Sequence, residues 1–152
     1  MQAGSQTTTM TTAESEVRRF YSDWKDCINQ LATEPAAGLA YFNDPPDVGI
    51  FDLMTTAVEG EKFIEHWWQV APFFANGTIE FQDVKVHASD TVAFVTMLQH
   101  YKGTDGNGNP FNFRYRVTDG LQKIDGRWRI VHEHISFPID LETQKADLLS
   151  ER

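Results

Sequence analysis

The sequence predicts an α+β fold, in which helices come first and a run of long strands follows. In the first third of the chain, apolar residues recur at three- and four-residue steps, the spacing of one face of an α-helix. From residue 78 onward, apolar and polar residues alternate through long segments separated by turn formers, the pattern of half-buried strands. The pair Asp125-Gly126 joins the last two segments and readily supplies the positive φ angles of a tight hairpin. Helices followed by a meander of strands are typical of the α+β class.

The length of 152 residues is enough to bury a sizeable core, and we expect one domain over 13–138. Residues 1–12 are rich in Thr, Gln, Ser and Gly and lack the cationic start and apolar centre of a secretory signal. We therefore expect a flexible lead and a cytoplasmic protein. Residues 139–152 form an acidic tail with a weak helical pattern.

Three helices and a short strand are expected before the long strands. The first helix covers 13–32 and carries one apolar stripe, made of Val17, Phe20, Tyr21, Trp24, Ile28 and Leu31. A proline, favourable in a first turn, opens a short helix over 35–41. The short strand covers 48–53, and the third helix covers 60–68 and is ended by the next proline.

Four long strands are expected over 79–87, 91–101, 111–123 and 127–137. The second of them is apolar on both faces. One face holds Val92, Phe94, Thr96, Leu98 and His100, and the other holds Ala93, Val95, Met97, Gln99 and Tyr101. Such a strand is covered on both sides. The helices supply one cover, and the chain has no layer left for the other, so we expect a homodimer packed sheet to sheet.

Asp119 is the residue of the third long strand that asks for an explanation. It shares a face with five apolar residues: Phe111, Phe113, Tyr115, Val117 and Leu121. A carboxylate on an apolar face must find a partner, take up a proton or line a cavity. One interpretation is a pocket acid whose pKa is raised by desolvation. The other is a residue near the strand end whose carboxylate is capped by backbone amides or by Arg116.

The last strand offers two sets of polar side chains on opposite faces. His132 and His134 share one face, and an imidazole that reached the cavity would suit acid–base work because it titrates near neutrality. Glu133 lies on the other face. A bulge in this strand would exchange the two sets, so the sequence leaves both assignments open.

Composition excludes several classes of function. The formal net charge of −9 disfavours a nucleic-acid partner or an anionic membrane surface. No run of apolar residues is long enough to span a membrane. The single cysteine, Cys27, excludes an intrachain disulfide and a cysteine-rich zinc site. Aromatic residues, 12% of the chain, suggest a large-ring core or an aromatic-lined pocket.

Two motifs carry a family resemblance. The order of the elements, together with the stretches 116–119 (RVTD) and 126–136 (GRWRIVHEHIS), resembles the SnoaL-like branch of the NTF2-like superfamily over residues 13–138. That superfamily includes ketosteroid isomerases, scytalone dehydratase and SnoaL-type polyketide cyclases. The resemblance implies a cone-shaped, strongly curved mixed or antiparallel sheet wrapped around the long first helix. It also implies a cavity between the two and a dimer across the other face of the sheet.

The same resemblance suggests roles for individual residues. Asp119 falls close to the place where ketosteroid isomerases hold the protonated Asp of their oxyanion hole, and Tyr21 matches the Tyr on the first helix of those enzymes. Their general-base Asp has only loose matches here, in Asp44, Asp47 and Asp52.

The sequence thus predicts a protein with a hydrophobic cavity for a small apolar or aromatic ligand, without cofactor or metal. As an enzyme it would be an isomerase, dehydratase or cyclase acting on a ring-containing carbonyl compound. Asp119 would polarise the carbonyl as a neutral acid, and His132 or His134 would move a proton. The pocket is expected to contain Tyr21, Trp24, Phe51, Trp67, Met97, Phe113, Tyr115, Val117 and Glu133. The alternative is a non-catalytic ligand-binding or dimerisation module of the same fold.

Overall fold

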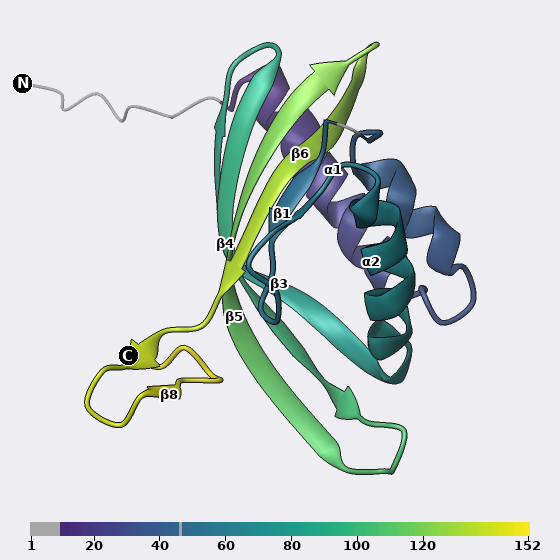
Figure 1. The fold of residues 1–152 in the computed structure, drawn as a ribbon. Helices are drawn as coiled ribbons and strands as arrows, with labels where there is room; N and C mark the ends of the chain where they lie inside the picture. Colours follow the sequence, from purple (N-terminus) through teal and green to yellow (C-terminus); the bar gives the residue numbers. More distant parts are fainter. Residues whose placement is uncertain (1–9, 46) are drawn as a thin grey trace, which may run out of the picture.

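The structure of the chain is a computed structural model that describes residues 10–45 and 47–152. Most of the expected flexible lead, residues 1–9, lies outside the described residues. The architecture is one strongly bent sheet with the helices on its concave face (Figure 1). This confirms the predicted α+β class and the curved sheet wrapped around the first helix.

The sheet has six strands in the order β2-β1-β6-β5-β4-β3. Strand β1 runs parallel to β6, and the other neighbours pair antiparallel. The strands are β1 (Gly49–Phe51), β2 (Val58–Glu59), β3 (Gly77–Ala88), β4 (Val92–Thr104), β5 (Pro110–Ile124) and β6 (Arg127–Ser136). The four long strands lie where the alternation predicted them, with ends shifted by up to three residues.

Helix α1 (Thr12–Ile28) crosses the concave face of the sheet (Figure 1). It begins one residue before the predicted start, because the Thr11 hydroxyl accepts a hydrogen bond from the Glu14 amide at 3.1 Å. Its buried side chains are Ala13, Val17, Tyr21, Trp24 and Ile28, the expected stripe. The helix ends four residues earlier than predicted, and turns follow it.

The remaining helical segments close one side of the fold. They are the 3₁₀ helices η1 (Pro35–Tyr41) and η2 (Ala71–Asn76), and the α-helix α2 (Lys62–Val70) between them in the chain. Trp67 on α2 donates a hydrogen bond from Nε1 to the Pro35 carbonyl at 2.9 Å, which ties α2 to η1. None of the described helices has the length and apolar character needed to cross a membrane.

The two faces of the long strands differ sharply. On β4, the alternating set Ala93, Val95, Met97, Gln99 and Tyr101 is buried, whereas Val92 and Phe94 are exposed. The helices cover the concave face, and no layer of the described residues covers the convex face (Figure 1). The sheet-to-sheet homodimer expected from this strand stays a prediction.

The C-terminal tail differs from its weak helical pattern. It forms a small hairpin of β7 (Ile139–Asp140) and β8 (Lys145–Ala146), not a helix. The turn is held by Asp140, whose carboxylate accepts hydrogen bonds from the amides of Glu142 and Thr143. These local hydrogen bonds from an Asp side chain favour a turn over a helix.

Candidate active site

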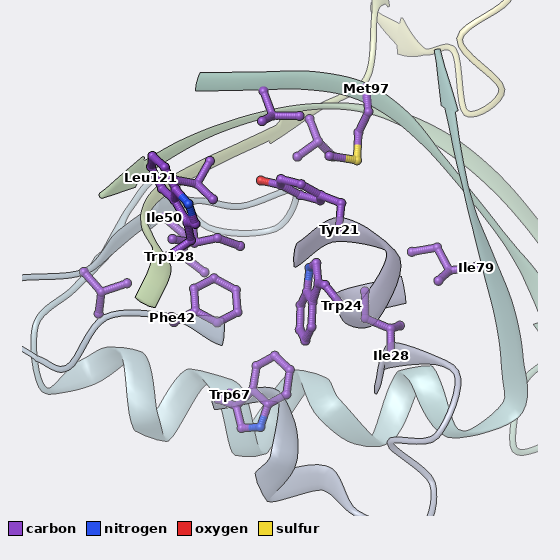
Figure 2. Close-up of a cluster of buried hydrophobic side chains, with 14 of the residues drawn as sticks. Tyr21, Trp24, Ile28, Phe42, Ile50, Trp67, Ile79, Met97, Leu121 and Trp128 are labelled. Carbon is purple, nitrogen blue, oxygen red and sulfur yellow. The ribbon is translucent and has the colours of Figure 1, made fainter. Parts of the chain in front are cut away.

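A cavity of about 650 Å³ lies between the concave face of the sheet and the helical segments. Its walls are mostly apolar, and their aromatic side chains include Trp24, Phe42, Phe63, Trp67, Phe113 and Tyr115. Figure 2 shows Trp24, Phe42 and Trp67 gathered beneath the sheet. Three ring contacts join them, with centroid distances of 5.6 Å, 6.2 Å and 6.0 Å. The size and the apolar walls suit a small ring-containing ligand.

Charged groups in this cavity are few and mostly acidic. Glu133 on β6, Asp52 after β1 and Asp105 after β4 contribute carboxylates, and His66 on α2 is the single basic side chain among the described lining residues. None of these lining residues is Lys or Arg. The cavity therefore offers hydrogen-bonding and proton-transfer groups but no fixed cation for an anionic ligand.

Asp119 lies one layer behind the cavity wall and is fully buried. Tyr21 reaches it from α1, and its hydroxyl donates a hydrogen bond of 2.6 Å to Oδ2 of Asp119. The other carboxylate oxygen, Oδ1, is buried and has no hydrogen-bond partner within the described part of the chain. Glu133 is the acidic neighbour of Asp119 on the adjacent strand.

Asp119 and Glu133 face each other across strands β5 and β6, since the two residues are register partners. Burial raises the pKa of Asp119 to about 6, and hydrogen bonds from Glu133 and Tyr21 oppose that rise. Burial also raises the pKa of Glu133 well above its usual range, and the charge of Asp119 and a hydrogen bond to it add to this. Two neighbouring buried carboxylates repel each other, and the Tyr21 hydroxyl stabilises the ionised form of Asp119, so the arrangement favours a proton on Glu133.

A β-bulge decides which side chains of β6 enter the cavity. The pairing of β5 with β6 steps from Gly120–His132 to Leu121–Ile130, which leaves Val131 as the extra residue. Trp128 and Ile130 before the bulge point into the core, and so do Glu133 and Ile135 after it. The bulge thus brings the even-numbered residues before it and the odd-numbered residues after it to the same face of the sheet.

His132 and His134 are consequently outside the cavity. Their rings contact Phe51 edge-on, at centroid distances of 4.8 Å and 5.4 Å. His134 and Phe51 are exposed. The expectation that one of the histidines reaches the cavity is corrected by this geometry, and Glu133, the other open assignment, occupies that position. Phe51 is likewise not a pocket residue.

The other expected pocket residues divide into two layers. Trp24, Trp67, Phe113 and Tyr115 line the cavity, as Glu133 does. Tyr21, Met97 and Val117 are buried in the core behind it. Figure 2 shows Tyr21 and Met97 close together under the sheet.

A second polar pair lines the cavity and was only weakly indicated by the sequence. Nε2 of His66 lies 2.8 Å from Oδ2 of Asp52, and both side chains are largely buried. Asp52 also acts on Glu133, since its negative charge contributes to the raised pKa of Glu133. The apolar spacing of 60–68 gives no reason to select His66, because His66 shares the face of Phe63 and Trp67.

Gln99 is another polar lining group, and the sequence analysis did not select it. It is buried, and Nε2 lies 3.6 Å from Sδ of Met97. The signal was present, since a Gln on the inward face of a strand poses the same question as Asp119. Among the described residues, no group of three or more His, Cys, Asp or Glu side chains is arranged to hold a metal ion.

Comparison with known proteins identifies the family to which this chain belongs. The family model of the SnoaL-like domain matches residues 25–140. The chain belongs to the SnoaL-like domain family. It lies in the NTF2-like branch of folds, as the neighbouring structures show. No curated protein matches the chain in sequence.

Solved structures resemble this SnoaL-like protein over most of its length. An NTF2-like protein of unknown function from Pseudomonas putida has 27% sequence identity and a TM-score of 0.76, over 92% of this chain and 97% of that chain. A candidate ketosteroid isomerase from Shewanella frigidimarina has 20% identity and a TM-score of 0.60, over 83% and 95%. The association domain of a calmodulin-dependent kinase, CaMKII, from C. elegans has 19% identity and a TM-score of 0.59, over 81% and 94%. The last two likenesses show the fold alone.

Proposed function

We propose that this protein is a cofactor-independent acid–base enzyme that acts on a small, ring-containing carbonyl compound in the aromatic cavity. The observation that carries the proposal is Glu133, a buried carboxyl group that lines the cavity and whose pKa is raised by burial and by the charge of Asp119. A neutral carboxylic acid in an apolar site donates a strong hydrogen bond to a carbonyl oxygen on which negative charge develops.

Asp119 has a positioning role in this proposal. It is too deep to touch a ligand in the cavity, but its carboxylate accepts hydrogen bonds from Glu133 and from the Tyr21 hydroxyl. Tyr21 and Asp119 thereby fix the direction of the Glu133 carboxyl group and keep its proton in place. The sequence suggested Asp119 as the acid, and we propose instead that Glu133 on the neighbouring strand has this role.

The Asp52–His66 pair supplies the base. If Nε2–H of His66 donates to Asp52, Nδ1 carries the lone pair that accepts a proton from carbon. Asp52 holds the ring orientation and stabilises the imidazolium that forms. Acid and base then belong to different elements, β6 and α2, which line the same cavity.

Isomerisation of a β,γ-unsaturated ketone illustrates the chemistry. His66 removes the proton from the carbon between the carbonyl and the double bond, while Glu133 donates a hydrogen bond to the carbonyl oxygen. The dienol or dienolate so formed takes the proton back from His66 at the γ-carbon, which leaves the conjugated ketone and restores both groups. No electrons are gained or lost, so no cofactor is needed. The fold likeness to a candidate ketosteroid isomerase supports the choice of this reaction as a first assay.

The test is turnover of a bicyclic β,γ-unsaturated ketone, followed by the ultraviolet absorbance of the conjugated product. We expect Glu133→Gln to lower the rate by about 10²-fold or more, the range of general-acid contributions. Asp105→Asn, which makes the same change from a carboxyl group to an amide elsewhere on the cavity wall, is the matched control and should retain most of the rate. A protein that is stabilised by the ketone but forms no product with any carbonyl of the panel would instead be a binding module.

A further inference from the structure

Two polar side chains of the cavity wall take no part in the proposed acid–base chemistry. Gln99 on β4 and Tyr115 on β5 both line the cavity, and each is only 5% exposed. They are register partners on adjacent antiparallel strands, and both are buried on the concave side. Because the side chains of directly opposite residues stand about 5 Å apart, the two form one polar spot in a wall that is otherwise mostly apolar.

The hydrogen-bonding capacity of this pair is largely unused by the protein. Nε2 of Gln99 lies 3.6 Å from Sδ of Met97, and a thioether sulfur is a weak acceptor. Within the part of the chain that the structure describes, neither the Gln99 carbonyl oxygen nor the Tyr115 hydroxyl has a hydrogen-bond partner. Buried polar groups in folded proteins nearly always have one. An amide and a hydroxyl without protein partners on a cavity wall therefore indicate a place where a ligand binds.

This polar pair lies at a distance from Glu133. Tyr115 precedes Asp119, the register partner of Glu133, by four residues on β5. At about 3.3 Å per strand residue, the two positions are roughly 13 Å apart along the sheet. The side chains point to the concave side of a strongly bent sheet, so their ends lie closer together than their Cα atoms (Figure 1). One ligand of two or three fused rings is long enough to contact both.

The chemistry of the pair matches a neutral hydroxyl group. Burial raises the pKa of Tyr115 far above its usual range, and the ionised carboxyl groups of Glu133 and Asp52 add to the rise, so the Tyr115 hydroxyl keeps its proton and can donate it. The Gln99 carbonyl oxygen accepts. A ligand hydroxyl both accepts and donates, so it satisfies both side chains at once. A carboxylate or phosphate would bring a negative charge towards Asp52, and the described lining contains no Lys or Arg to compensate.

We propose that Gln99 and Tyr115 form a second binding subsite, which holds a hydroxyl group of the ligand while the ligand's carbonyl lies at Glu133. The substrate is then a fused-ring hydroxyketone with its two oxygens at opposite ends of the ring system. Anchoring both ends fixes which carbon of the substrate faces His66. This inference rests on the cavity being the ligand site of the proposed function, and it holds whether or not the ligand is turned over.

The test is titration calorimetry with two matched pairs of ligands. One pair is decalin-2-one and 6-hydroxydecalin-2-one, and the other is perhydrophenanthren-2-one and its 7-hydroxy derivative, so the hydroxyl lies at two different distances from the carbonyl. In an apolar wall the added hydroxyl weakens binding, because it loses its hydrogen bonds to water. We expect instead that the hydroxyketone of at least one pair binds about 3- to 10-fold more tightly than its parent, the effect of one net hydrogen bond.

Two substitutions locate the bound hydroxyl. Tyr115→Phe and Gln99→Met each remove the polar group and nearly keep the size of the side chain. The measured quantity is the ratio of the two dissociation constants within a ligand pair, which we expect each substitution to bring to about one or to reverse. Tyr101→Phe is the matched control and should keep the ratio, since Tyr101 also lines the cavity but its hydroxyl donates to the Phe73 carbonyl.

The outcomes separate this inference from the proposed function. A protein that gains affinity from the hydroxyl but does not isomerise the unsaturated ketone supports the subsite and contradicts the acid–base enzyme. A protein that isomerises the ketone but gains no affinity from the hydroxyl in either pair overturns the subsite alone, and this result does not depend on whether a variant folds. The subsite is also overturned if none of the four ligands binds, or if Tyr101→Phe changes the ratio as much as Tyr115→Phe does.

Discussion

At the scale of single residues, the chemistry proposed for the cavity depends on whether Asp119 or Glu133 holds a proton. Asp119 and Glu133 are both buried, both have raised pKa values, and face each other across two strands. Tyr21 breaks the symmetry of the pair by donating to Asp119 alone. We therefore expect the proton on Glu133, the cavity side of the pair, which is what a general acid requires.

The pair makes stability depend on pH in a defined direction. The folded protein binds protons more tightly than the unfolded chain, because the pKa of Asp119 rises from 3.8 to about 6 and that of Glu133 rises from 4.5 well above its usual range. The stabilisation is complete below about pH 4 and is lost as pH rises through the folded pKa values. The free energy of unfolding should thus fall with increasing pH, by up to about 1.4 kcal/mol per pH unit per proton; the shift of Asp119 alone corresponds to about 3 kcal/mol, and Glu133 adds to it in the same direction.

Denaturant titrations at several pH values between 4 and 8 measure the slope of the unfolding free energy against pH. The variant that carries both Asp119→Asn and Glu133→Gln lacks the pair, so its slope should be smaller than that of the unsubstituted protein. Equal slopes for the two proteins would mean that the pair has ordinary pKa values.

Tyr21 offers a second residue-scale prediction. Tyr21→Phe removes the donor to Oδ2 of Asp119 and leaves a buried carboxylate oxygen unpaired, which costs about 1–3 kcal/mol. Tyr41→Phe is the control, since Tyr41 also packs on Trp24 and its hydroxyl makes no hydrogen bond within the described part of the chain. Equal unfolding midpoints for the two variants would contradict the proposed role of Tyr21.

Sequence reasoning located Asp119 but not the orientation of the last strand. Alternation along the third long strand correctly placed Asp119 on the inward face. The same rule fails for 127–137. The bulge at Val131 puts even-numbered residues such as Ile130 on the inward face before it and odd-numbered residues such as Glu133 on the inward face after it. A bulge depends on how two strands pair, and no single residue of this segment predicts it.

At the scale of elements, the cavity wall depends on the close contact of η1 with α2. Gly38 lies in η1, and a Cβ built there would come within 2.2 Å of the Trp67 ring. Trp67 cannot move freely, because Nε1 donates to the Pro35 carbonyl. The glycine therefore sets the spacing of the two segments.

Gly38→Ala tests this contact. We expect a loss of about 1–3 kcal/mol of unfolding free energy, the usual cost of an overpacked core, and weaker binding of any cavity ligand. Gly49→Ala is the matched control, since its nearest neighbour would be at 3.5 Å, an ordinary contact. If both variants unfold at the same denaturant concentration, η1 and α2 are less tightly joined than described.

The helices and strands were the most predictable elements, for physical reasons. Periodicity indicates which segments are helical or extended, and Pro35 marks the start of η1. The early end of α1 and the tail hairpin were not predicted, because both depend on local hydrogen bonds. The Asp140 carboxylate, for instance, stabilises a turn that a weak apolar pattern does not reveal.

At the scale of the whole molecule, the cavity selects ligands by charge as well as by size. Its described lining contains three carboxyl groups and one histidine, within a protein of net charge −9. A carboxylate ligand would be desolvated beside like charges, without a Lys or Arg among those lining residues to compensate.

Thermal melting with a matched pair of ligands measures this selectivity. We expect decalin-2-one to raise the melting temperature more than decalin-2-carboxylate at the same concentration and neutral pH. Asp105→Asn should narrow the difference by removing one negative charge from the wall, since hydrogen bonds from the Asn109 and Asn107 amides lower the pKa of Asp105. A carboxylate that stabilises the protein more than the ketone would contradict the charge argument.

The chemistry proposed for the cavity requires a proton on Glu133 at neutral pH, and carboxyl ¹³C NMR across pH 3–9 measures where that proton resides. Signals are assigned with Asp119→Asn and Glu133→Gln. The account predicts that Glu133 keeps its proton at pH 7 and that Asp119 titrates near 6, with each group's titration altered when the other is neutralised. Ionisation of Glu133 below pH 5, near the ordinary value for a glutamate, would contradict the account and leave the cavity without its proposed acid.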